Sequence, residues 1–226
     1  MTLGLDVPDT SRLGRWKRPA LVWARTPIAK AFSVHWDIQV TGRENIPDGP
    51  AILAANHAGV FDGPMLVAFT PRCIALAKTE LFTGIQGRFV RAAGQIPVYR
   101  FGYDIAAIRA CLQLLEAEQV LAIFPEGTRG RGDMSHARRG AAYLAMVTGA
   151  PVIPVALLGT KAASGDVRDL PPRRARMHIV YGGAIDVPAV PWPRTKQAVG
   201  ETTEFLRQRC AEHIERAQRD TGLTLI

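Results

Sequence analysis

The sequence is organised around residues 51–62, AILAANHAGVFD. The run of five small or branched apolar residues at 51–55 predicts a short buried strand. A histidine follows the strand, with an aspartate five residues after it. Positions i and i+5 point about 140° apart on a helix, so His57 and Asp62 can meet only across a turn. The residues typical of that turn, and of a helix start at the proline, are Gly59, Gly63 and Pro64.

A histidine oriented by a carboxylate is suited to one kind of chemistry. A neutral imidazole can take a proton from a hydroxyl group as that oxygen attacks an acyl carbon. A carboxylate on the other ring nitrogen fixes the tautomer and stabilises the imidazolium. The sequence has no Gly-x-Ser-x-Gly nucleophile turn, so the attacking hydroxyl would come from the substrate. An isolated His-x4-Asp pair, however, is more often a local hydrogen bond with a structural role.

Three further blocks follow in order: Gly94-Gln95-Ile96-Pro97-Val98-Tyr99-Arg100, Phe124-Pro125-Glu126-Gly127-Thr128-Arg129 and Val152-Ile153-Pro154-Val155. With the first block they resemble the glycerolipid acyltransferase family, which includes the 1-acylglycerol-3-phosphate (lysophosphatidic acid) acyltransferases. The resemblance covers roughly residues 40–190. The last block holds no ionisable group, which indicates a structural role for it.

The resemblance implies roles for particular residues. His57 and Asp62 would be catalytic, Arg129 would bind the phosphate of the acceptor, and Arg100 would support Arg129. The remaining candidates for substrate binding are Glu126, which would shape the loop, with Gly127, Thr128 and Lys78, the last in a Lys-Thr-Glu-Leu-Phe context. From the residues alone, the alternatives are that Glu126 and Arg129 pair with each other or with the strand end, and that Lys78 is a solvated surface lysine. No metal site and no bound cofactor are implied.

The implied reaction moves a fatty acyl group from acyl-CoA or acyl carrier protein to the free hydroxyl of 1-acylglycerol 3-phosphate, giving phosphatidate. Within the class, glycerol 3-phosphate or another lysolipid is an alternative acceptor. A thioesterase in which His57 activates water is a second alternative. A nucleic-acid-binding protein is a weaker alternative, because the basic segments lack a known nucleic-acid module. A non-catalytic lipid-surface binder, built mainly on residues 12–36, is another.

The net charge of +8 over 226 residues implies an acidic partner, which would be nucleic acid, an anionic membrane or phosphorylated substrates. The three cysteines are far apart in the sequence, which predicts neither a zinc site nor a disulfide framework. No apolar run is long enough for a transmembrane helix, and the N-terminus lacks the features of a signal peptide. We therefore expect a peripheral or interfacial protein on the cytoplasmic face of the membrane.

Residues 1–36 differ in composition from the rest and are predicted as a separate segment, with the acyltransferase domain at 37–226. Between Arg12 and Trp36 there are six basic residues, no acidic residue and three of the four tryptophans. This composition is typical of basic amphipathic helices at a membrane interface, interrupted here by Pro19 and Pro27. The alternative is a helix packed on the domain with a solvated basic face.

The rest of the chain alternates between strand and helix patterns, which predicts an α/β fold with a mixed central sheet flanked by helices. Strands are expected at 34–40, 51–55, 73–77, 96–99, 120–124, 152–157 and 177–181. Helices are expected at 64–69, 105–115, 140–147 and 195–220. In the second of these helices, a stripe at spacings of three and four is expected to face the core: Ile105, Ile108, Leu112 and Leu115.

Overall fold

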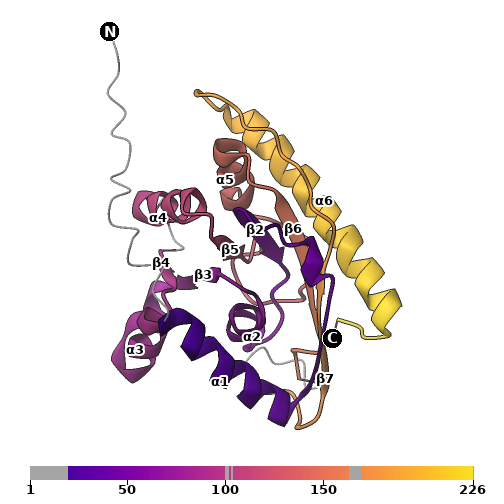
Figure 1. The fold of residues 1–226 in the computed structure, drawn as a ribbon. Helices are drawn as coiled ribbons and strands as arrows, with labels where there is room; N and C mark the ends of the chain where they lie inside the picture. The colour runs from indigo at the N-terminus through magenta and orange to yellow at the C-terminus, as the bar shows by residue number, and fades with distance from the viewer. Residues whose placement is uncertain (1–19, 100–101, 103, 163–168, 226) are drawn as a thin grey trace.

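The computed structural model describes residues 20–99, 102, 104–162 and 169–225, with the backbone alone at residues 20–24 and 86. The strands of this part of the chain form one mixed sheet with helices on both faces (Figure 1). The predicted fold class is therefore confirmed. The basic residues between Arg12 and Arg18 lie outside the described residues.

The sheet has the strand order β1-β7-β6-β2-β5-β3-β4. The strands are β1 (Asp37–Thr41), β2 (Ala51–Ala55), β3 (Cys73–Lys78), β4 (Ile96–Val98), β5 (Val120–Ile123), β6 (Val152–Leu158) and β7 (Arg176–Tyr181). Neighbouring strands are parallel except for the antiparallel pair β6 and β7. The carboxyl ends of β2 to β6 therefore lie along one side of the sheet, here called the carboxyl edge. In open α/β sheets this is the side on which ligands bind.

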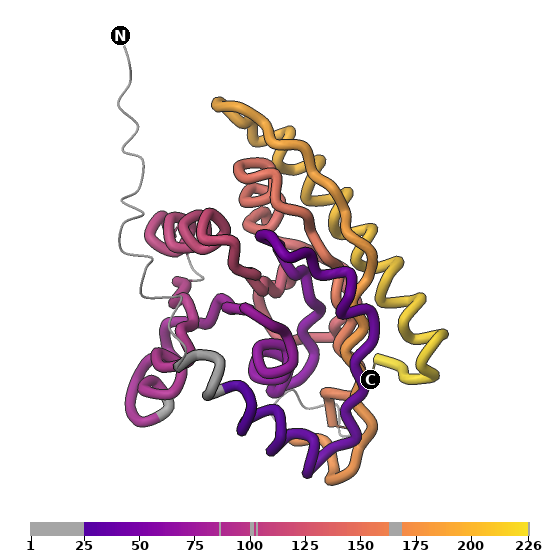
Figure 2. The backbone as a smooth tube through the Cα atoms, in the orientation of Figure 1, coloured from indigo at the N-terminus to yellow at the C-terminus, as the bar shows by residue number. Residues whose placement is uncertain are grey.

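The helices form two layers, one on each face of the sheet (Figure 2). They are α1 (Ala20–His35), α2 (Asp62–Phe69), α3 (Gly84–Ala92), α4 (Ile105–Glu116), α5 (Gly140–Thr148) and α6 (Lys196–Thr221), with short 3-10 turns η2 (Arg43–Asn45) and η3 (Thr79–Phe82). Core residues of α1 and α2 pack on one face, and those of α4, α5 and α6 pack on the other.

The central strand β2 is buried along its whole length, as is its neighbour β6. Successive side chains of β2 alternate between the two cores: Ile52 and Ala54 face α4 to α6, and Leu53 faces α1 and α2. A strand buried on both faces has to be apolar throughout, which explains the unbroken apolar run that begins the organising stretch. The chain thus delivers residue 56 to the middle of the carboxyl edge.

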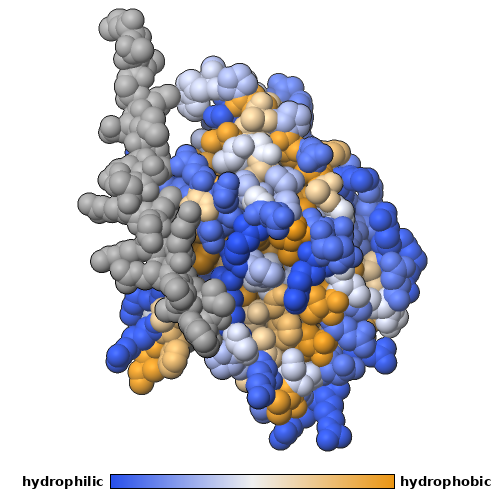
Figure 3. All heavy atoms as spheres, viewed as in Figure 1, coloured by the Kyte–Doolittle hydropathy of each residue, from blue (hydrophilic) through white to orange (hydrophobic). Residues whose placement is uncertain are grey.

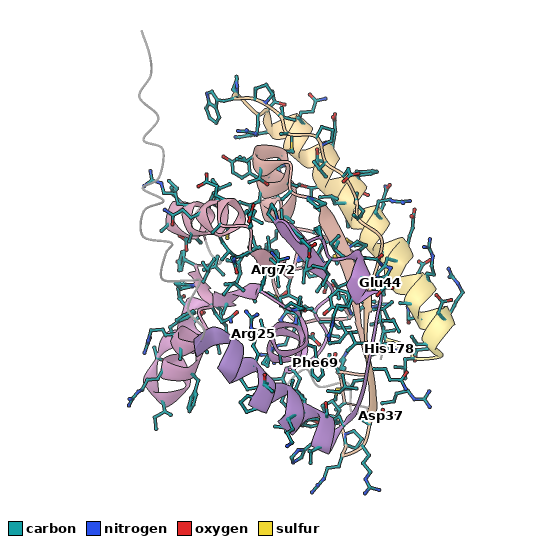
Figure 4. The ribbon with its side chains drawn as sticks, viewed as in Figure 1. Arg25, Asp37, Glu44, Phe69, Arg72 and His178 are labelled. Atoms are coloured by element: carbon teal, nitrogen blue, oxygen red, sulfur yellow. The ribbon has the colours of Figure 1, made fainter. Side chains whose placement is uncertain are left out.

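Helix α1 differs from the sequence prediction. Pro27 lies inside it and does not end it, so the expected break there is wrong. The helix is held along its length by tertiary contacts: Arg25 donates a hydrogen bond to the carbonyl of Cys73 at the start of β3 (Figure 4), and Phe32 packs edge-on against Phe61. Because α1 continues to His35, the strand expected at 34–40 starts only at Asp37.

Two further differences concern helices. Helix α3 was not predicted, because Gly84 and Gly87 are unfavourable in a helix. The prediction of which residues of α4 face the core is wrong in part, since Ile105 is 63% exposed. The buried residues of α4 lie on a neighbouring stripe: Ala107, Cys111, Leu114 and Leu115. Both stripes have helical spacing, and the choice between them depends on how the helix sits on the sheet.

None of the helices in the described ranges is both long enough and apolar enough to cross a bilayer.

Candidate functional site

The residue that follows β2 extends the sheet by one position. The buried amide of Asn56 donates from Nδ2 to the carbonyl of Leu157 on β6, at 3.1 Å, and its Oδ1 accepts from the Leu157 N–H at 2.7 Å. The side chain therefore takes the place that a backbone peptide would occupy in the ladder between β2 and β6. His57 follows directly, so its backbone is fixed to the two central strands.

His57 and Asp62 meet across the predicted turn. The Nδ1 atom of His57 lies 2.8 Å from Oδ2 of Asp62, and the same oxygen accepts from the N–H groups of Ala58 at 2.7 Å and Gly59 at 2.8 Å. Asp62 is fully buried and is the first residue of α2, two residues before the predicted helix start. Three hydrogen bonds to one carboxylate oxygen hold both the turn and the imidazole in place.

The arrangement leaves the Nε2 nitrogen of the imidazole available for chemistry. An ionised carboxylate can only accept a hydrogen bond, so Nδ1 of His57 carries the hydrogen and Nε2 carries the lone pair. The ring stacks on Phe124 with 4.3 Å between centroids, and its side chain remains 21% exposed. No described residue hydrogen-bonds to Nε2. His57 can therefore accept a proton from a group that enters the site.

The turn fits tightly against its neighbours. A Cβ atom on Gly59 would collide with the backbone carbonyl of Thr160, in the loop that follows β6. A Cβ atom on Gly132 would lie 3.0 Å from both the Asn56 amide nitrogen and the Ala58 side chain. Loops after β5 and β6 thus pack directly on the segment that carries His57 and restrict its conformation.

The loop after β5 brings the second group of predicted residues to the same place. The N–H of Gly130 donates to the carbonyl of His57 at 2.9 Å. Arg129 precedes Gly130 in the chain, so this hydrogen bond holds its backbone near His57. Gly127 has a φ of +72°, a conformation that favours glycine. The side chain of Arg138 packs over it, where a Cβ atom would clash with the guanidinium. Thr128, between them, is exposed.

This loop carries a concentration of positive charge that could hold an anion. Arg129 is half-buried, while Arg131, Arg138 and Arg139 are exposed. Arg131 is paired with Asp133 at 3.0 Å and its side chain is 86% exposed. A guanidinium can bind a phosphate through two parallel hydrogen bonds. Among the residues that the structure describes, no three His, Cys, Asp or Glu side chains form a cluster of the kind that holds a metal ion.

Glu126 points inward, away from the solvent. Its side chain is only 3% exposed, and Oε1 accepts from the backbone N–H of Met134 at 3.3 Å. Burial raises the pKa of the Glu126 carboxyl to about 7, and hydrogen bonds from the backbone of Met134 and His57 oppose the shift. The carboxyl group therefore connects the loop to the backbone of His57 from the inside.

A contact from the distant C-terminal helix supports the same loop. Arg207 on α6 donates to the carbonyl of Met134 at 3.0 Å and pairs with Glu204 one turn away at 2.7 Å. Met134 is fully buried and has a φ of +54°. This contact could not be predicted from local sequence features, because the two residues are 73 positions apart.

The remaining predicted residues are placed as follows. Lys78 ends β3 at the carboxyl edge, separated from His57 by β5, and is half-buried. Arg100 lies outside the described residues. Two residues around His57 were not assigned a role from the sequence: Asn56, which anchors the segment that carries it, and Phe124, which stacks on its ring. A polar residue directly after a fully apolar strand is a usable signal for the first of these.

The burial of Glu126 predicts a pH dependence of stability. A folded pKa raised from 4.5 to about 7 means that the contribution to the free energy of unfolding is present below about pH 4.5 and is lost as pH rises through 7. The loss is at most about 3 kcal/mol, at about 1.4 kcal/mol per pKa unit.

In Glu126→Gln, which stays neutral, unfolding in urea should show a smaller decrease in stability between pH 5 and pH 8. The exposed Glu44→Gln is the control, and parallel pH curves for the Glu126 variant and the native protein would contradict the prediction.

Comparison with known proteins places these features in a family. A family model described as Acyltransferase matches residues 37–158. The chain is 29% identical over 147 residues to a chloroplast 1-acyl-sn-glycerol-3-phosphate acyltransferase of Arabidopsis thaliana, an alignment that covers 62% of this chain and 40% of the relative. It is 28% identical over 185 residues to the 1-acyl-sn-glycerol-3-phosphate acyltransferase of Bacillus subtilis, covering 80% of this chain and 90% of the relative. The chain thus spans less than half the length of the plant relative.

The fold has a counterpart among solved structures. The crystal structure of the 1-acyl-sn-glycerophosphate acyltransferase PlsC from Thermotoga maritima superposes with a TM-score of 0.64 at 24% sequence identity. The match covers 86% of this chain and 79% of that protein. At this identity the likeness concerns the fold.

Proposed function

Because the chain belongs to the acyltransferase family, we propose that it transfers a fatty acyl group from an acyl thioester to the free hydroxyl of 1-acylglycerol 3-phosphate, giving phosphatidate. The observation that carries the proposal is the His57–Asp62 pair, with Nε2 of His57 available, next to a loop whose Arg129 can bind a phosphate. Relatives from a chloroplast and from Bacillus subtilis that bear the name of this activity support the choice of acceptor.

The proposed reaction is a single direct transfer. Nε2 of His57 takes the hydroxyl proton of the acceptor while that oxygen forms a bond to the carbonyl carbon of the thioester. The carbon–sulfur bond then breaks, and the leaving thiolate recovers the proton from the imidazolium. Asp62 stabilises the imidazolium and keeps the ring in the tautomer that the first step needs. The hydroxyl of the acceptor serves as nucleophile, so the protein contributes none.

The phosphate of the acceptor would be bound beside the histidine. Arg129 is the main ligand in this proposal, with Arg100 and Lys78 as further cations and with the Gly127–Thr128 turn shaping the approach. The donor would be acyl-CoA or acyl carrier protein. Binding the phosphate in a fixed place holds the free hydroxyl within reach of Nε2, and positioning of this kind accounts for a large part of enzymatic rate enhancement.

We also propose that the protein works at the surface of an anionic membrane, on its cytoplasmic face. The basic and tryptophan-rich composition of residues 12–36 supports this, since such segments bind at lipid interfaces. In the described part of the segment, helix α1 exposes Ile28, which is 42% accessible, and Val34, which is 66% accessible. Acceptor and product are both lipids, so a location at the membrane gives direct access to them.

The role of Arg129 is testable through the acceptor. Arg129→Ala is expected to raise the KM for 1-acylglycerol 3-phosphate about 10- to 100-fold, because hydrogen bonds to a charged group contribute about 1.5–3 kcal/mol. The KM for the phosphate-free analogue 1-acylglycerol should change little. Both are measured as release of coenzyme A thiol from palmitoyl-CoA at varied acceptor concentration.

The control for this prediction is Arg131→Ala, in the same loop, where the side chain is 86% exposed and paired with Asp133. It should change the KM for the phosphorylated acceptor by less than about threefold, in line with the small energies of exposed ion pairs. An unchanged KM in Arg129→Ala would move the phosphate site elsewhere.

A further inference from the structure

Helix α3 has an apolar outer face with basic residues beside it. The two most exposed large apolar side chains of the described chain are Ile85, at 75%, and Phe89, at 72%, and they lie one turn apart on this helix. Figure 3 shows hydrophobic atoms gathered at the lower left, in the region where Figure 1 places α3, with hydrophilic atoms next to them. A contiguous exposed apolar surface rimmed by polar residues is typical of a site that binds a membrane or a partner.

The packing of α3 accounts for this orientation. Gly87 is buried, and a Cβ atom there would collide with the backbone of Phe82 in η3. The side of the helix at Gly87 is therefore fixed against the protein. Residues two positions away point about 200° from it, at about 100° per residue, so Ile85 and Phe89 are directed outward. Because the contact at Gly87 leaves no room for rotation, their exposure is built into the fold.

The charges on α3 are all positive. The helix holds two arginines, Arg88 and Arg91, both exposed, and no acidic residue. Arg91 also donates to the carbonyl of Phe82, which fixes its position relative to η3. Counting from Gly87, Arg88 lies at about 100° and Arg91 at about 40°, so both lie on one side of the helix, Arg88 beside the apolar face and Arg91 nearer the contact with η3. This is the arrangement of a helix that lies in an anionic lipid interface.

We propose that α3 is a membrane-contact element, which inserts Ile85 and Phe89 into the acyl region of an anionic bilayer and sets Arg88 and Arg91 at the level of the lipid headgroups. The inference rests on the proposed function, since acceptor and product are membrane lipids. It adds a second contact, remote in sequence from the N-terminal segment. Helix α3 is joined through η3 to Lys78 at the carboxyl edge, so contact there brings this edge of the sheet toward the lipid.

A lipid surface fits this face better than a protein partner does. Side chains that are about three-quarters exposed project from the molecule, and inserting them into fluid acyl chains requires no complementary pocket. Anionic headgroups complement the two arginines, each of which contributes to the attraction within a Debye length of the surface. An acidic carrier protein or a second copy of this chain would need a matching cavity for Phe89.

The first test measures partitioning onto vesicles by sedimentation. The double variant Ile85→Asn/Phe89→Asn should bind vesicles of equal phosphatidylcholine and phosphatidylglycerol about tenfold or more weakly than the native protein, because two apolar side chains no longer enter the bilayer. The matched control is Trp192→Asn. Trp192 is 65% exposed but lies in the segment between β7 and α6, two residues after Val190, which bonds to the carbonyl of Met146 on α5. Its loss should change binding by less than about twofold.

The second test locates α3 without depending on loss of binding. The three native cysteines are buried, so a thiol introduced by Ile85→Cys can be labelled selectively with an environment-sensitive fluorophore. Its emission should shift to shorter wavelength on phosphatidylglycerol vesicles, whereas the label on Trp192→Cys should not respond. Equal responses at both positions would overturn the proposal, as would unchanged partitioning of the double variant.

The outcome is separable from the proposed function. Transfer to detergent-dispersed lysophosphatidate should proceed at the native rate in the double variant, since neither residue belongs to the site. If the native protein proved inactive while the double variant still lost vesicle binding, the membrane contact would stand and the proposed function would fall. Unchanged partitioning would overturn the proposal. If the variant instead raised the KM for an acyl carrier protein donor, or changed the oligomeric state of the protein in solution, α3 would be a protein-binding surface.

Discussion

Replacing His57 with alanine is expected to lower kcat for acyl transfer by about 10³-fold or more, with the thermal stability nearly unchanged. A positioned general base contributes about 10²–10⁴ in rate, and His57 is the group whose free nitrogen adjoins the proposed acceptor site. Its ring is 21% exposed and stacks on Phe124, so removing it leaves most of the core packing in place. The rate is measured as phosphatidate formed per active protein, with thermal unfolding recorded on the same samples.

The matched control is His35→Ala. His35 is exposed at the end of α1, and its Nδ1 bonds only within the helix, to the carbonyl of Ala31 at 2.9 Å. Removing that histidine should leave kcat within about twofold of the native value. Native activity in His57→Ala would reject His57 as the base. If the variant lost much of its thermal stability, unfolding would explain the lost activity.

The second large effect is expected at Asp62. Asp62→Asn should lower kcat by about 10²–10⁴, because the neutral amide no longer stabilises the imidazolium and can hold the ring in the wrong tautomer. Oδ2 of Asp62 accepts three hydrogen bonds, while Oδ1 is buried without a partner among the described residues. An amide nitrogen placed in that position would be buried without an acceptor, which costs about 1–3 kcal/mol.

Asp62→Asn should therefore lose both activity and some stability, whereas His57→Ala should lose activity alone. Urea unfolding together with kcat distinguishes the two patterns, and the exposed Asp48→Asn serves as the control. If Asp62→Asn kept its rate and lost only stability, the carboxylate would be a structural residue of the turn and would have no part in the chemistry.

Much of this arrangement was predictable from local sequence features. The i and i+5 spacing of His57 and Asp62 excludes a straight helix, and the glycines that follow indicate a turn; the structure joins the pair at 2.8 Å. The alternation of apolar strands and helices predicts an α/β sheet. Parallel strands then bring the ends of β2 and β5 to the same edge, which explains why Arg129 lies near His57.

Other features depend on contacts between distant segments and could not be predicted from the sequence. Glu126 turns inward because the loop beyond it folds back and presents the N–H of Met134, and that loop is held in turn by Arg207 on α6. Pro27 is tolerated because tertiary contacts hold α1 on both sides of it. Helix α3 forms despite its glycines because Gly87 allows it to approach η3 closely. In each case tertiary packing overrides a local preference.

The most direct test of the central claim is to identify the product. Palmitoyl-CoA labelled in the acyl group is incubated with the protein, with and without lysophosphatidate, and the lipids are separated while thiol release is followed. Direct transfer predicts labelled phosphatidate, formed only when the acceptor is present and in equal amount to the thiol released. Thiol release that ignores the acceptor and yields labelled free fatty acid would contradict it, since water would then be the nucleophile and the protein a thioesterase.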